Sequence, residues 1–243
     1  MRQHGSVLML LARSTLWKLL GLFLVMAAVE AGLFARSLGQ VLGQEVYGLE
    51  QVLEGSRLPW VFGAAFLLTA VLLCGTGCEF GSRPGYLLRR LSVSEQAVWA
   101  WQAGYNACCL FLLWAVQIFL LLAFSAAYLT LADPEIVTGQ TLVLAAYRND
   151  FFHSLLPLAE ALRWVCHLLA VAAFGICSAS FPYQQRRRKV PVAAPVCALL
   201  ILWGLCRPMG GGYSVLACLI PAVCASGLAM VHVLSGKEEP DEV

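Results

Sequence analysis

Long apolar runs alternate with short polar segments along most of this chain. A helix needs about 20 mostly apolar residues to cross roughly 30 Å of hydrocarbon. The runs near that length cover residues 18–36, 58–78, 103–131, 156–180, 190–206 and 214–234. This pattern predicts an all-α, polytopic membrane protein with about six transmembrane helices in a single transmembrane domain, residues 1–236. A short acidic tail, residues 237–243, is expected to follow it in the cytoplasm.

The fifth and first runs need separate consideration. Residues 190–206 are about 17 residues long, at the lower limit for a spanning helix, and are interrupted near "CRPMGGG". The fifth and sixth runs therefore either both cross the membrane or form a re-entrant hairpin. The first run carries Glu30 and is not followed by a small-residue cleavage pattern. We expect it to stay in the protein as a membrane anchor.

Composition agrees with a lipid-facing chain. The sequence is 60% hydrophobic and 12% charged, whereas soluble domains carry about 25% charged residues. The net charge of +2 and the lack of basic stretches with interleaved aromatics argue against a nucleic-acid partner. The ten cysteines fall almost entirely in apolar runs, so we interpret them as small packing residues. Cys74 and Cys78 share a helix face, but no histidine or carboxylate accompanies them, so no metal is expected.

The distribution of lysine and arginine predicts the orientation. With the N-terminus inside, the inner segments hold eleven of these residues: Arg2, Arg13, Lys18, Arg83, Arg89, Arg90, Arg186, Arg187, Arg188, Lys189 and Lys237. The outer segments hold five: Arg36, Arg57, Arg148, Arg163 and Arg207. Positive residues favour the cytoplasmic side. We therefore expect both termini in the cytoplasm of a cell-membrane protein, with the basic run "QQRRRKV" as the strongest topology signal.

The outer segments contain further helical patterns. Within residues 37–57, apolar residues recur at helical spacing between glutamates, at Leu42, Val46, Leu49 and Leu53. This spacing predicts an amphipathic helix on the outer surface. We expect another such helix within residues 135–153.

The segment "YLLRRLSVSEQA", residues 86–97, stands between the second and third runs. Ser92 and Glu95 have the spacing of a capping box, which predicts a helix that begins near Val93 and continues into the third span. The preceding residues predict a short helix whose apolar face contains Leu87, Leu88 and Leu91. In that helix the adjacent cations, Arg89 and Arg90, face water, lipid headgroups or a partner. The alternative is a loop that serves only as a positive-inside topology tether.

This segment resembles the cytoplasmic loop of six-span permease subunits of ABC-type exporters, in the type-two export class. The matching residues are Leu88, Arg89, Arg90, Leu91, Ser92, Val93 and Ser94. The N-terminal stretch "LMLLARSTLWKLLG" is similar to the interfacial helix that precedes the first span in that family. The resemblance implies that residues Leu87 to Ser92 dock onto a separate ATP-hydrolysing subunit. It also implies that the permease works as a homodimer or with a second permease chain in the bilayer.

Ionisable residues inside the apolar runs form a second candidate site. Glu160, Arg163 and His167 share one face of the fourth run, and Glu30 of the first run is expected to approach His167. Charges at such positions commonly face a partner or a water-filled path. The alternative is an intrahelical ion pair beside a hydrogen-bonded histidine. We interpret Gln117 and Asn106 as interhelical hydrogen-bonding residues, and Gly175 with Ala179 as a close-packing pair.

Enzymatic function is not expected. The chain has no H-E-x-x-H, G-x-S-x-G or Walker-type glycine loop, so ATP hydrolysis would need another subunit. No cofactor is indicated. Two functions stay open: an exporter permease subunit, or a non-transporting membrane scaffold or accessory protein. The sequence does not indicate a substrate.

Overall fold

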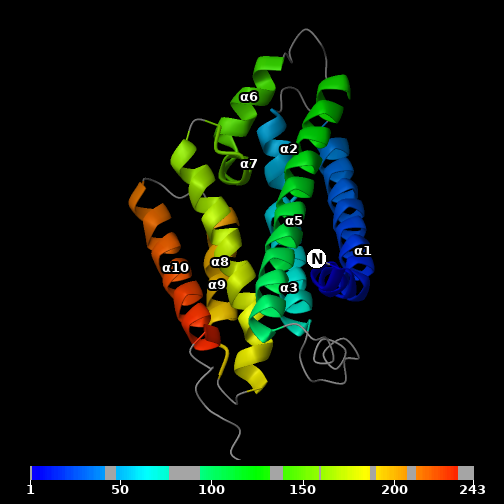
Figure 1. Ribbon diagram of the computed structural model, residues 1–243. Helices are drawn as coiled ribbons and strands as arrows, with labels where there is room; N and C mark the ends of the chain where they lie inside the picture. The colour runs from blue at the N-terminus through cyan, green and yellow to red at the C-terminus, as the bar shows by residue number, and fades with distance from the viewer. Residues whose placement is uncertain are drawn as a thin grey trace, which may run out of the picture.

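The computed structural model of the protein is built from helices, and no strand occurs in its described part (Figure 1). That part covers residues 2–41, 48–76, 94–131, 139–158, 160–186, 190–206 and 212–234. The helices are α1 (Arg2–Val41), α2 (Leu49–Gly55), α3 (Leu58–Gly75), α5 (Glu95–Leu131), α6 (Gly139–Arg148), α7 (Asp150–Leu155), α8 (Ala161–Arg186), α9 (Ala193–Cys206) and α10 (Gly212–Leu234). The predicted all-α class is confirmed.

The longer helices run side by side in one bundle. α5 packs against α1 and α8, α8 also packs against α9 and α10, and α3 contacts α1, α8 and α9. The short helices α2, α6 and α7 gather at the upper end in Figure 1, which we call the cap end. The beginning of α1 and the last turns of α10 lie toward the opposite end, which we call the terminal end. The beginning of the first described helix and the end of the last one therefore lie on the same side of the bundle.

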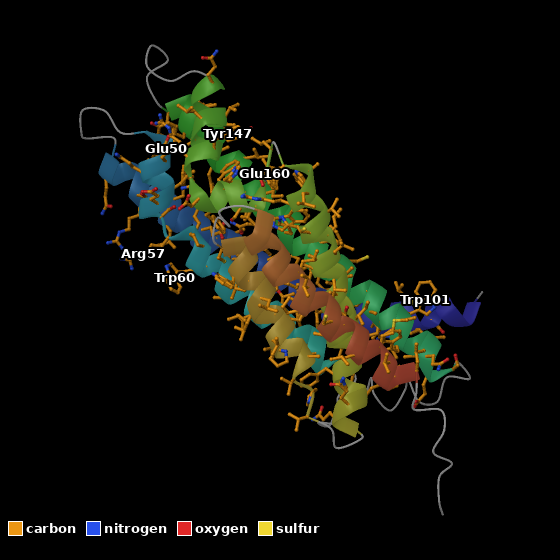
Figure 2. The ribbon with its side chains drawn as sticks, turned by 90° about the vertical axis from the view of Figure 1, so that its left-hand side faces the viewer. Glu50, Arg57, Trp60, Trp101, Tyr147 and Glu160 are labelled. Atoms are coloured by element: carbon orange, nitrogen blue, oxygen red, sulfur yellow. The ribbon has the colours of Figure 1, made fainter. Side chains whose placement is uncertain are left out.

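Helices α1, α3, α5 and α8 are long and apolar enough to cross a membrane. Their outward faces carry large apolar side chains, such as Leu24, Val71 and Phe119, which are 71%, 68% and 69% exposed. Figure 2 shows Trp60 and Trp101 toward opposite ends of the bundle, as expected for aromatic residues at the two membrane interfaces. The multi-pass membrane class follows from these features. The shorter apolar segments Ala193–Cys206 and Leu219–Val231 belong to α9 and α10.

Several predicted boundaries were wrong by a few residues to more than one turn. α5 begins at Glu95, so it extends well beyond the run that starts at residue 103 and agrees within two residues with the helix start predicted near Val93. The backbone amide of Ala97 donates to Ser94 Oγ at 3.4 Å. Ser94 therefore occupies the capping position at the start of the described helix, and Ser92 lies outside the described residues. α8 begins only at Ala161 because the chain around Pro157 forms a bend, fixed by a bond from Trp164 Nε1 to the Pro157 carbonyl.

The N-terminal stretch forms the beginning of α1. Its first turns, dark blue in Figure 1, lie at an angle to the rest of the helix. Val7 and Leu11 are buried there against Val98 of α5, and the hydroxyls of Thr15 and Tyr105 are 2.6 Å apart. The start of α1 is thus tied to the first turns of α5.

The short helices of the cap end pack against the rest of the bundle. In α2, Leu49, Val52 and Leu53 are buried in the main core, and Ser37 Oγ of α1 donates to the Val52 carbonyl. The predicted amphipathic pattern is therefore present over the second half of residues 37–57, but its apolar face contacts α1 and α6. Leu42 and Val46 lie outside the described residues. Two short helices, α6 and α7, cover most of the second predicted segment.

α5 and α8 approach each other closely at Gly175. A Cβ atom on Gly175 would lie 2.7 Å from the carbonyl oxygen of Ala103 and 2.9 Å from the Cβ of Ala107. Asn106 Nδ2 donates to Ser178 Oγ at 2.8 Å along the same contact. Small residues allow this approach, and the amide bond links the two helices. The predicted roles of Gly175 and Asn106 are confirmed.

Candidate functional site

The predicted docking segment is flanked by two spanning helices at the terminal end. Its residues Leu87, Leu88, Arg89, Arg90, Leu91 and Ser92 lie outside the described residues. The flanks themselves are joined, because Gln102 Nε2 of α5 donates to the Thr76 carbonyl at 2.7 Å, just after α3 ends. Tyr183 of α8 donates through its hydroxyl to the Glu95 carbonyl at 2.5 Å. A force on the segment would therefore reach α3, α5 and α8 together.

The predicted intramembrane cluster is divided between three places in the structure. The first contains Glu160 and Arg163, whose side chains form an ion pair with Arg163 Nε 2.5 Å from Glu160 Oε2. Arg163 is 9% exposed, whereas Glu160 is exposed beside the cap helices (Figure 2). His153 of α7, which the sequence analysis did not select, has its Nε2 4.0 Å from Glu160 Oε1. This group joins the beginning of α8 to α7 at the cap end.

His167 lies one turn deeper in an aromatic cluster. Its ring meets the Trp114 ring edge to face, with centroids 5.6 Å apart, and Trp114 also contacts Trp164 at 5.4 Å. The indole of Trp114 donates to the Leu155 carbonyl at 3.1 Å. His167 Nδ1 is buried without a hydrogen-bond partner among the described residues, and the ring packs against Trp114.

Glu30 lies apart from this cluster. Its side chain is fully buried between α1 and α5, where Gln117 Nε2 donates to Glu30 Oε2 at 3.0 Å. The expected partner was His167. Glu30 instead has Gln117 as its partner, while the ring of His167 contacts Trp114, one turn earlier on α5. The interhelical role predicted for Gln117 is confirmed.

The described residues hold no group of three or more metal-ligating side chains. Cys109, Cys177 and Cys197 are buried in the main hydrophobic core. Cys74 is half-buried, and Cys78 lies outside the described residues. The interpretation of the buried cysteines as packing residues agrees with their positions.

A groove of about 510 Å³ opens between α3, α8 and α9. Its lining is almost entirely apolar and includes Leu67, Val71, Phe174, Phe181, Ala198 and Leu199. The sequence analysis missed this groove because its walls come from helices far apart in the chain, and no local motif marks them. Within a membrane-spanning bundle such a surface suits a hydrocarbon chain.

Comparison with protein-family models, with curated proteins and with solved structures found no match to this chain.

Proposed function

We propose that this chain is the membrane-spanning permease subunit of an ABC-type exporter, driven by a separate ATPase subunit. The observation that carries the proposal is the position of the segment from Leu87 to Ser92. It connects α3 to α5, whose adjoining ends are hydrogen-bonded to each other and to α8. A leucine-rich basic helix at that point would transmit movement of a bound ATPase to three helices at once.

The proposal includes six spans, with α9 and α10 as the fifth and sixth. α9 has 14 residues, a rise of about 21 Å, which is short for a bilayer. Its contacts nevertheless reach both ends of α3. Ala194 lines the groove together with Gly75, the last residue of α3, while Cys206 Sγ lies 3.8 Å from the carbonyl of Pro59 near the start of α3. These contacts support a full crossing over a re-entrant hairpin.

The proposed orientation places the terminal end in the cytoplasm of a cell membrane. The loops between α3 and α5 and between α8 and α9 carry most of the inner lysine and arginine residues. Both loops connect helices at the terminal end, where an ATPase would bind. The ion pair between Glu50 and Arg148 would then lie outside, on the cap.

Reporter fusions test this orientation. We expect a reporter fused after Val243 to be cytoplasmic and one inserted near Gly43 to be exported, because the positive residues hold the terminal end inside. Paired alkaline phosphatase and fluorescent-protein fusions at both positions measure the outcome. The reversed pattern would contradict the topology.

In the proposed mechanism, ATP binding closes the ATPase, and the segment from Leu87 to Ser92 carries that movement into the bundle. The joint between Gln102 and Thr76 makes the ends of α3 and α5 move together. The spans then alternate between inward and outward exposure. A second copy of the chain or a second permease chain would complete the path.

Capture of the ATPase tests the proposal. We expect Leu88→Asp with Leu91→Asp to reduce capture about tenfold or more, because charge would replace the apolar contact face. Arg89→Ala with Arg90→Ala should weaken capture less. The measurement is a pull-down from detergent of the Walker-loop protein encoded beside this gene, normalised to the membrane level of the permease.

Arg187→Ala with Arg188→Ala is the matched control, since it removes two positive charges from another loop on the same side. It should leave capture unchanged. Normal capture by both double variants in the docking segment, or no neighbouring Walker-loop gene, would favour a non-transporting scaffold.

A further inference from the structure

The buried pair formed by Glu30 and Gln117 has one hydrogen bond and two remaining acceptors. Both residues have 0% of their surface exposed, and Gln117 Nε2 donates to Glu30 Oε2 at 3.0 Å. Glu30 Oε1 and Gln117 Oε1 are also buried, and neither has a hydrogen-bond partner among the described residues. Two oxygen acceptors in one pair therefore face no donor.

An ionised Glu30 would be poorly compensated in this position. A buried carboxylate is stable when a cation or several hydrogen bonds offset its lost hydration. Among the described residues, Glu30 forms no ion pair with an arginine, lysine or histidine, and its hydrogen bond comes from a neutral amide. One neutral donor does not replace the hydration of a full charge.

The helices around Glu30 offer no nearby countercharge in the described structure. α3 contains no charged residue, and the single charged residue of α5 is Glu95, 22 residues or about 33 Å along the helix from Gln117. On α1 the nearest cation is Arg36, six residues further on, which is exposed and about 120° around the helix axis from Glu30.

Other titratable groups on the packed helices are also accounted for. Glu50 of α2 pairs with Arg148 at the cap. Glu54 of α2 is exposed. On α5, Tyr105 bonds to Thr15 near the terminal end, and Tyr128 lies 11 residues, or about 16 Å, beyond Gln117.

We infer that Glu30 binds a proton at neutral pH and forms a neutral acid–amide pair with Gln117 that joins α1 to α5. The proton comes from the solvent and stays on the carboxyl group, and no covalent bond changes apart from the new O–H. The protonated carboxyl group becomes a donor where the pair otherwise holds two unmatched acceptors. The inference does not depend on the exporter proposal.

Proton binding gives this joint a specific pH dependence. A glutamate in an unfolded chain is ionised at pH 7, so the folded chain would hold one proton more than the unfolded chain. As pH rises, the folding equilibrium constant then falls about tenfold for each pH unit over which the folded chain holds one more proton than the unfolded chain. Stability contributed by the pair is therefore lost as pH rises, and raising the pH would weaken the contact between α1 and α5.

The variant Glu30→Gln separates protonation from shape. It keeps a neutral side chain of the same size that can both donate to and accept from Gln117, so the fold should be retained. Infrared spectra of the full chain in lipid vesicles should show the carbonyl stretch of a buried protonated carboxylic acid at pH 7. That band should be absent in the variant.

The second readout is the midpoint of thermal unfolding in detergent between pH 6 and pH 9, measured at one scan rate. The wild-type midpoint should fall relative to that of Glu30→Gln as pH rises, while the variant reports the effect of all other groups. A carboxylate band alone at pH 7, or a constant difference between the two midpoints, would overturn the inference. The first outcome would mean that water or an ion keeps Glu30 charged.

Discussion

Replacing Gly175 by alanine should destabilise the protein by about 2–3 kcal/mol, at the upper end of the range for overpacking. The added Cβ atom would lie 2.7 Å from the Ala103 carbonyl oxygen and 2.9 Å from the Cβ of Ala107. The first contact is with backbone, so α5 and α8 would have to move apart. That movement would lengthen the hydrogen bond between Asn106 and Ser178. The midpoint of thermal unfolding in detergent measures the loss.

Gly104→Ala is the matched control on α5. A Cβ atom there meets nothing within 4 Å, and alanine favours a helix over glycine by up to about 1 kcal/mol. The control should therefore be neutral or slightly stabilising. Equal losses in the two variants would mean that the distance between α5 and α8 does not limit the fold.

Replacing Phe62 by alanine should cost about 3 kcal/mol. This fully buried side chain on α3 contacts Phe66, and its ring is 5.9 Å from the ring of Phe151 on α7. The variant would leave a cavity where α3 meets the cap. We expect the lower end of the usual range because an apolar side chain that leaves the core of a membrane protein enters lipid and not water. The loss of stability then comes mainly from lost packing contacts.

Limited proteolysis from the cap side, together with the unfolding midpoint, measures this effect. Phe119→Ala removes the same side chain from a position on α5 that is 69% exposed, so it should change stability by less than about 0.5 kcal/mol. If Phe119→Ala were as damaging as Phe62→Ala, burial would not explain the difference.

The local sequence pattern predicted many of the helices but few of the contacts between them. The apolar runs located α3 and α5 because a spanning helix must satisfy its own backbone hydrogen bonds. They failed at residues 156–160, where Pro157 and the bond from Trp164 produce a bend that an apolar count does not register. The capping box of Ser92 and Glu95 placed the start of this helix about two residues too early, because α5 begins at Glu95 and the described cap contact is to Ser94.

In the candidate site, too, a contact within one helix was predictable and the contacts between helices were not. The pair of Glu160 and Arg163 follows from their i, i+3 spacing on one helix. The pairing of Glu30 with Gln117 depends on how α1 is rotated against α5, and nothing within either sequence run specifies that rotation. His153 was missed for a related reason, because it approaches Glu160 only through the fold of the cap.

The short helix α9 has a consequence for the lipid around the protein. Its 14 residues present an apolar wall about 21 Å high, next to α3 with 18 residues and about 27 Å. Leu199 and Trp203 on that wall are 60% and 56% exposed. In the proposed six-span arrangement, the hydrocarbon layer beside α9 would be thinned below its usual thickness of about 30 Å, at a cost that grows with each ångström of mismatch. Thin bilayers would therefore accommodate this side of the protein with the least deformation.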